Sequence, residues 1–127
     1  MQKLIYKKLA PIIFSSEFHN TGYLNITSDG FMPLVIERLS EKLISLSHYF
    51  ESNGDLVSDP DMVVEFDRMN ETANAVSYQD AYRYQDVRDE FDRVSDKKLQ
   101  IELNRFLIFW LKNLEMQGFF EEIYANS

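Results

Sequence analysis

Histidine is the side chain best suited to exchanging protons near neutral pH, and this chain has two, His19 and His48. Neither lies in a Gly-x-Ser-x-Gly nucleophile elbow. His48 falls in a run of alternating apolar residues, so we expect its side chain to point into the core, where a lone histidine is usually hydrogen-bonded. The alternative interpretation makes His48 a proton-transfer group in an enzymatic or small-molecule pocket that also contains Asp55 and Tyr78.

Metal coordination is the second chemistry that the residue types could support. The chain has no cysteine, which removes thiolate sites, and its two histidines lie far apart. Asp55, Asp59 and Asp61 are closely spaced, but they lack the ligand spacing and central glycine of an EF-hand loop. Aspartates beside Gly54 and Pro60 are more typical of turns. The sequence therefore predicts no metal site, no cofactor and no established catalytic residue.

Negative charge is concentrated in the middle of the chain. The net charge is −8, and residues 51–96 alone hold 13 acidic and 4 basic residues, a balance of −9. Such a surface repels phosphate, so we expect no direct nucleic-acid binding, and it attracts basic protein surfaces. The other interpretation is a solvated face that keeps the protein in solution. The residues predicted to bind a basic partner are Asp80, Asp86, Asp89, Glu90 and Asp92.

Strands must position most of these residues, because apolar and polar side chains alternate through the middle of the chain. The alternation predicts strands over residues 34–39, 43–51, 62–67 and 75–80, and residues 23–26 allow a further short strand. We therefore expect an antiparallel meander, since the connections between these segments are short.

An antiparallel hairpin from Leu43 to Phe66 is the centre of this meander. Asn53-Gly54 tolerates the positive φ angles that a type I′ turn requires at both central positions. Pro60 cannot donate to a strand ladder, which predicts a bulge or a sheet edge. The residues that follow are predicted to alternate, with Met62, Val64 and Phe66 pointing inward and Val63, Glu65 and Asp67 pointing outward.

Helices are predicted at both ends of the chain. Residues 2–13 read as a short amphipathic helix that stops near Ala10 or kinks at Pro11, and residues 15–30 read mainly as loop. A long helix begins after a Ser95 or Asp96 N-cap and ends near Gly118. Its apolar stripe consists of Leu99, Leu103, Phe106, Leu107, Trp110, Leu111 and Leu114.

These elements predict an α+β fold: an antiparallel β-meander of three to five strands, with the long C-terminal helix packed on one face and a short N-terminal helix. We expect a single domain over residues 1–127. The longest apolar run is too short to span a bilayer and no signal-peptide pattern is present, so we expect a cytoplasmic protein. Ile108 and Phe109 lie off the apolar stripe, which leaves a homodimer as one use of the last helix.

The run from His48 to Met62 resembles an uncharacterised family of small bacterial proteins that share roughly the pattern His-Tyr-x-x-Asn-Gly-Asp-x-x-x-Asp-Pro-acidic-Met. The resemblance extends over residues 31–86, with an apolar strand before the pattern and another after it. Members of this family look like accessory proteins of phages, plasmids and conjugative elements. The resemblance implies no established activity and supplies no catalytic residues.

These observations favour a non-enzymatic acidic interaction module over an enzyme. In the mobile-element setting that the resemblance implies, small acidic proteins often occupy the positively charged nucleic-acid channels of host-defence nucleases. Our leading hypothesis is that the acidic face inhibits a nuclease of the CRISPR or restriction type. The pocket around His48 and the structural homodimer stay as alternatives.

Overall fold

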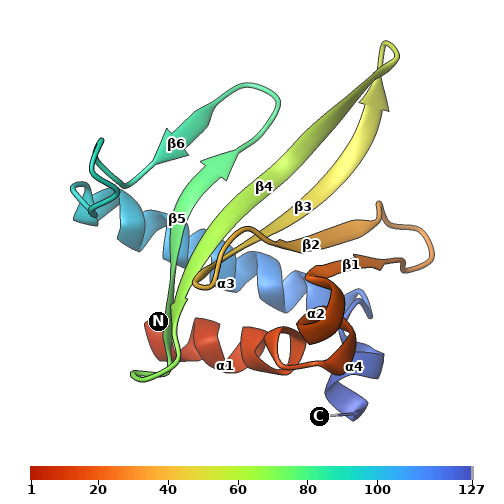
Figure 1. Ribbon diagram of the computed structural model, residues 1–127. Helices are drawn as coiled ribbons and strands as arrows, with labels where there is room; N and C mark the ends of the chain where they lie inside the picture. The colour runs from red at the N-terminus through yellow and green to blue at the C-terminus, as the bar shows by residue number, and fades with distance from the viewer. Residues whose placement is uncertain (127) are drawn as a thin grey trace.

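The computed structural model describes residues 1–126 as four helices and six strands (Figure 1). In chain order these are α1 (Gln2–Ile13), α2 (Ser16–Thr21), β1 (Tyr23–Ile26), β2 (Leu34–Arg38), β3 (Leu43–Ser52), β4 (Asp55–Asp67), β5 (Thr72–Gln79), β6 (Tyr84–Asp86), α3 (Lys97–Met116) and α4 (Glu121–Ala125). Among residues 1–126, no helix combines the length and apolar character needed to cross a membrane.

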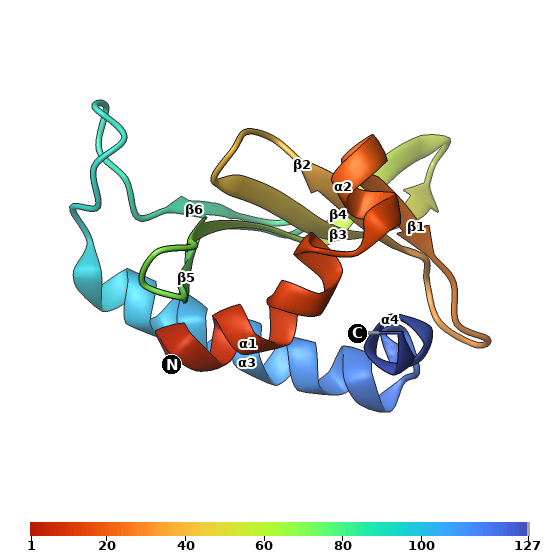
Figure 2. The same ribbon diagram turned by 60° about the horizontal axis from the view of Figure 1, so that its bottom comes forward.

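The strands form one antiparallel sheet in sequence order, β1-β2-β3-β4-β5-β6, and α1 and α3 pack side by side on one of its faces (Figures 1 and 2). The predicted α+β meander is therefore confirmed, with one strand more than the expected range. The extra strand is β6, whose three residues are too few to show alternation.

The β3–β4 hairpin has the predicted turn and the predicted interruption. Asn53 and Gly54 have φ angles of 53° and 84°, as a type I′ turn requires. The register then shifts, because Ser47 pairs with Asp61 whereas Tyr49 pairs with Ser58. Two residues of β4, the second of them Pro60, therefore lie opposite one residue of β3, which is the predicted bulge. The expected inward residues Met62, Val64 and Phe66 are buried.

A second bulge in β5 was not predicted. Val63 pairs with Ser77 but Val64 pairs with Ala75, so one residue of β5 is left without a partner on β4. Two side chains of α3 bond the backbone there: the Ala75 N–H donates to Asn104 Oδ1 (2.7 Å), and Gln100 Nε2 donates to the Ala75 carbonyl (3.2 Å). The long helix therefore supplies hydrogen bonds as well as apolar surface to the sheet.

The helix ends follow local capping chemistry. Helix α1 continues past Pro11 to Ile13, so it does not stop at Ala10. The loop expected after it contains α2, with the Ser15 hydroxyl as N-cap and Gly22 in the left-handed conformation as C-cap. Six residues are too few for a helical period to be recognised.

Helix α3 has the predicted caps at both ends. Asp96 Oδ1 accepts a hydrogen bond from the Leu99 N–H (3.0 Å). At the other end, Gly118 has a φ angle of 88°, and the N–H groups of Gly118 and Phe119 donate to the carbonyls of Glu115 and Leu114. These two bonds form a Schellman motif, which ends the helix where the sequence predicted.

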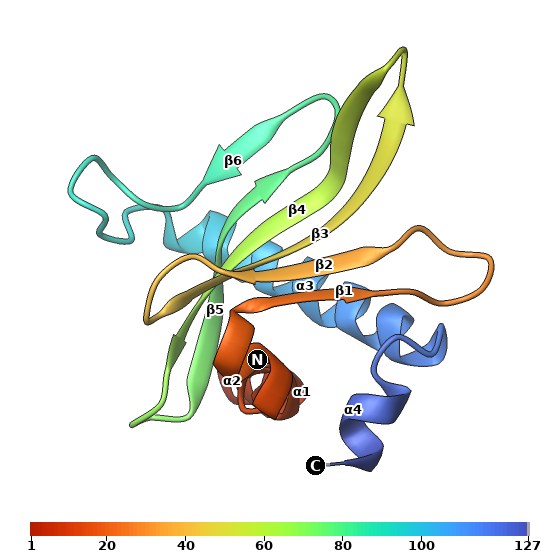
Figure 3. The same ribbon diagram turned by 45° about the vertical axis from the view of Figure 1, so that its right-hand side comes forward.

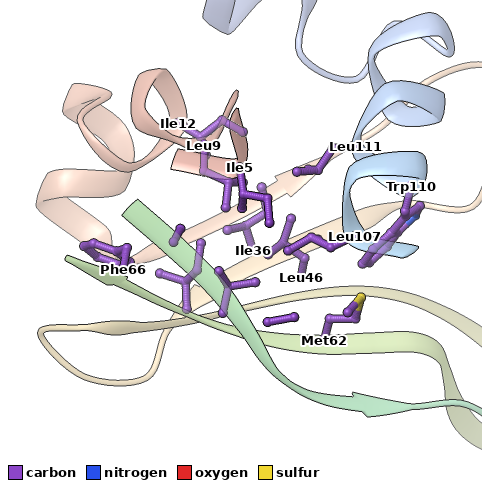
Figure 4. Packing of buried hydrophobic residues seen from close by; sticks show 14 of the residues in the cluster. Ile5, Leu9, Ile12, Ile36, Leu46, Met62, Phe66, Leu107, Trp110 and Leu111 are labelled. Carbon is purple, nitrogen blue, oxygen red and sulfur yellow. The ribbon is translucent and has the colours of Figure 1, made fainter. Parts of the chain in front are cut away.

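The core lies between the sheet and the helix pair α1–α3 (Figure 4). Ile5, Leu9 and Ile12 of α1 meet Ile36, Leu46 and Met62 of the sheet, with Leu107 and Leu111 of α3 beside them. Each fully buried aliphatic side chain contributes on the order of 2 kcal/mol of transfer free energy, so this cluster fixes which face of the sheet is covered.

Candidate interaction surface

The second face of the sheet carries no helix (Figures 2 and 3). Strand pairing places outward side chains in rows across it, and one such row consists of Val35, Ser47, Asp61 and Gln79. Several of these side chains are only half exposed, and Ser47 is 1% exposed. This surface, the open sheet face, is therefore well packed although no other element covers it.

The charges at the outward strand positions of the open sheet face are all negative, and the cations Lys42 and Arg88 lie beside these strands. Outside residues 49–58, the outward positions of the paired strand segments hold five carboxylates and no lysine or arginine. These carboxylates are Glu37, Asp61, Glu65, Asp67 and Asp86. The sheet strands therefore concentrate negative charge on the side that the helices leave free.

Asp61 is the most enclosed of these carboxylates. Burial raises its pKa above the ordinary value, the Ser47 hydroxyl opposes this effect, and the negative charge of Glu37 adds to it. Among the side-chain atoms of the described residues, Asp61 Oδ1 is the buried polar atom without a hydrogen-bond partner. The open face thus holds one carboxylate at an energetic cost.

Asp86 is held in the opposite way. Arg88 donates from Nε to Asp86 Oδ1 (3.0 Å) and from a terminal nitrogen to Oδ2 (2.9 Å), and the Tyr84 hydroxyl donates to Oδ2 (2.9 Å). The Arg88 hydrogen bonds are the main reason that the pKa of Asp86 falls to about 2. The bond to Asp86 in turn raises the pKa of Tyr84. Arg88 therefore neutralises this carboxylate locally.

Asp80 and Asp89 are turn-forming residues. Asp80 Oδ1 accepts from the N–H groups of Tyr82 and Arg83 (2.8 and 2.9 Å). Asp89 Oδ1 accepts from the N–H of Phe91 and from that of Arg93 (2.8 and 3.0 Å). Each aspartate also has an arginine near its carboxylate, so their charge is partly compensated. The hydrogen bonds that Asp80 accepts, first of all the one from the Tyr82 N–H, hold the pKa of Asp80 below its usual range.

Glu90 and Asp92 complete the predicted set, and both are exposed on the loop between β6 and α3. Asp92 lines a shallow hollow of about 410 Å³ with Leu43, Glu65 and Arg88. The structure therefore joins this loop to the open sheet face. It also divides the predicted acids into three that shape turns or pair with arginine and two that are presented to solvent.

His48 lies in a row of contacting aromatic rings beside α3. Its ring is 8% exposed, and its centroid lies 5.7 Å from that of Trp110 and 5.6 Å from that of Phe119. Since a carbonyl can only accept, His48 Nδ1 donates to the Pro33 carbonyl (3.1 Å). His48 has the surroundings of a hydrogen-bonded core residue, as the sequence suggested.

The three residues of the alternative pocket are spread along the sheet. Phe106 of α3 links the row of rings to Tyr78, which is 9% exposed and donates its hydroxyl hydrogen to Asp80 Oδ2 (2.9 Å). Asp55 instead pairs with Ser52 beside the hairpin turn, about 13 Å from His48 at the usual rise per strand residue. The structure therefore brings His48 and Tyr78 to one aromatic row and places Asp55 outside it.

A second and larger hollow contains none of the predicted site residues. It has a volume of about 1370 Å³ and opens between α1, β1 and α4, where Lys3 and Lys7 line it together with Glu121 and Glu122. Among the described residues, no group of three or more His, Asp or Glu side chains is arranged to hold a metal ion. Glu17 and Glu71 also line this hollow, so two lysines and four glutamates meet there.

Ile108 and Phe109 do not form a common surface. Ile108 is half-buried and packs against the core, whereas Phe109 is 60% exposed. Successive helix residues point about 100° apart, which is why one reaches the core and the other does not. Of these two residues, only Phe109 is exposed enough to contribute to a dimer contact through α3.

The family model described as Domain of unknown function (DUF6908) matches residues 6–120. The chain belongs to this family. The match spans all six strands and α3, and the expectation of an uncharacterised family is confirmed to that extent. No curated protein and no solved structure matches the chain. The hairpin pattern as a shared feature of the family and the mobile-element setting both stay predictions.

Proposed function

We propose that this protein is a non-enzymatic interaction module whose open sheet face binds a basic protein surface. The observation that carries the proposal is the set of five outward carboxylates outside residues 49–58, with no lysine or arginine among the outward positions of the paired strand segments. Opposite charge speeds the encounter of two surfaces and rejects partners of the same sign. Asp92 extends this charge along one rim of the face, and Glu90 is exposed on the same loop.

The partner that we propose is a host-defence nuclease of the CRISPR or restriction type. Such enzymes need a positively charged channel for the phosphate backbone, and an acidic protein surface can occupy it in place of nucleic acid. The resemblance of residues 31–86 to proteins of mobile elements supports this setting. An accessory protein of that kind acts by exclusion and needs no catalytic residue.

A nuclease panel tests the proposal. Cleavage of double-stranded DNA is followed for several restriction and CRISPR nucleases, with and without the protein, at low and high salt. We expect at least one nuclease to be inhibited, with the inhibition weakening as salt rises. If no nuclease in the panel is inhibited, the anti-defence function is wrong.

Matched charge reversals then locate the surface. Glu37→Lys/Glu65→Lys changes two exposed carboxylates of the open sheet face, and Glu102→Lys/Glu122→Lys makes the same change in net charge on α3 and α4. We expect the first pair to abolish inhibition and the second to preserve most of it. Equal losses would show that net charge alone matters and would contradict the assignment to this face.

A further inference from the structure

The β3–β4 hairpin continues beyond the rest of the sheet. Pairing of β3 with β2 ends at Leu34 opposite His48, and pairing of β4 with β5 ends at Asp61 opposite Gln79. Residues 49–58, which we name the arm, are therefore paired only with each other. Figures 1 and 3 show the arm projecting away from the helices and the neighbouring strands.

The two edges of the arm differ in their capacity to accept another strand. On the β4 side, Asp55–Ser58 runs directly into the bulge and Pro60, which lacks an N–H, so this edge is interrupted at the base of the arm. On the β3 side, Tyr49–Ser52 contains no proline or lysine, the usual protections of an exposed edge. The chain before β2 leaves this edge free, because Pro33 bonds to His48 and Phe31 packs on Phe119.

The side chains of the arm indicate what kind of strand fits there. The arm contains two acidic residues, Glu51 and Asp55, and no lysine or arginine, so two arms side by side would repel each other. Along the free edge, Phe50 is half-buried on the helix side and Glu51 is exposed on the other side. A strand added beside them would place one side chain next to Phe50 and its neighbour next to Glu51.

We propose that the Tyr49–Ser52 edge binds an extended basic segment of the partner by strand addition, and that this segment alternates apolar and cationic residues. The backbone groups of the edge would supply hydrogen bonds, while Phe50 and Glu51 would supply selectivity. The inference rests on the proposed function, because it states the form in which a basic partner meets this protein.

A defined peptide tests strand addition without a purified partner. The probe is a capped eight-residue peptide of alternating valine and lysine, added to the ¹⁵N-labelled protein and followed by amide chemical shifts. We expect saturable shifts at residues 49–58. The valine–glutamate peptide of the same length should produce none, and a valine–lysine peptide with proline at its centre should lose most of the effect. Shifts confined to the open sheet face, or equal shifts with both charge types, would overturn the inference.

A shortened arm provides the matched protein variant. Deleting Glu51-Ser52 and Asp55-Leu56 leaves Asn53-Gly54 to close the Phe50–Val57 pair, so the type I′ turn and the strand register are preserved. We expect unchanged amide shifts in the six-stranded sheet and no response to the valine–lysine peptide. A full response would overturn the inference. Nuclease inhibition without a peptide response would refute strand addition alone, whereas a peptide response without inhibition would refute the proposed function alone.

Discussion

The substitution Asn104→Ala tests how α3 stabilises the bulge in β5. Asn104 is 3% exposed, and it accepts from the Ala75 N–H (2.7 Å) and donates to Asn74 Oδ1 (3.0 Å). Ala75 lies next to the bulged residue Val76 and its N–H donates to Asn104, so the alanine variant leaves this buried N–H without that acceptor. The change is therefore expected to destabilise the whole sheet–helix contact.

The size of the effect follows from three contributions. An orphaned buried N–H costs roughly 1–3 kcal/mol, and loss of the bond to Asn74 adds about 1 kcal/mol. The higher helix propensity of alanine returns roughly 0.5 kcal/mol. We expect the free energy of unfolding to fall by about 2–3 kcal/mol, which for a chain of this length lowers Tm by about 8 °C.

Urea unfolding followed by circular dichroism measures this change. Asn113→Ala is the matched control, because Asn113 lies on the same helix, is half-buried, and makes no side-chain hydrogen bond among the described residues. It should change stability by less than about 0.5 kcal/mol. Asn104→Leu separates hydrogen bonding from burial. If that variant is as stable as the original protein, the position only fills space and our reasoning is refuted.

Two further predictions concern pH. The pKa of Asp86, lowered to about 2, means that its contribution to stability is present above about pH 4 and is lost as pH falls toward 2. Asp86→Asn should therefore lower the free energy of unfolding by about 1–2 kcal/mol at pH 7 and by much less at pH 2.5. A loss of stability that does not depend on pH would contradict the lowered pKa of Asp86. Asp61 has the opposite effect on stability, because its pKa is raised. The ionised Asp61 carboxylate destabilises the folded protein above that pKa, and this destabilisation is absent below pH 4. Asp61→Asn should stabilise by about 1 kcal/mol at pH 7 in urea unfolding, with the gain disappearing near pH 3, and no gain at pH 7 would refute the burial penalty.

Local chemistry explains which elements could be predicted. The turn at Asn53-Gly54, the bulge at Pro60 and the caps of α3 depend on backbone conformations and donors that a few residues control, and the structure has each of them. Helix α2 and strand β6 were missed because both are shorter than the period that would reveal them.

The candidate site was predictable only in part, because sequence shows charge but not what neutralises it. Asp80, Asp86 and Asp89 were expected to face a partner, and the structure shows each bonded to nearby backbone N–H groups with an arginine beside its carboxylate. Glu37 and Glu65 were not chosen, although both face outward on the open sheet face. Carboxylates on different strands come to lie on one common face only after the strands pair.

The sequence by itself determined the longer elements, the hairpin turn and the excess of negative charge. Alternation decides which side chains share a face of a strand, and capping residues decide where helices end. Only the tertiary structure decided which face α1 and α3 cover, since either face of an isolated strand could meet a helix. It also decided that the arm extends past β2 and β5, because the length of a strand pairing depends on both partners.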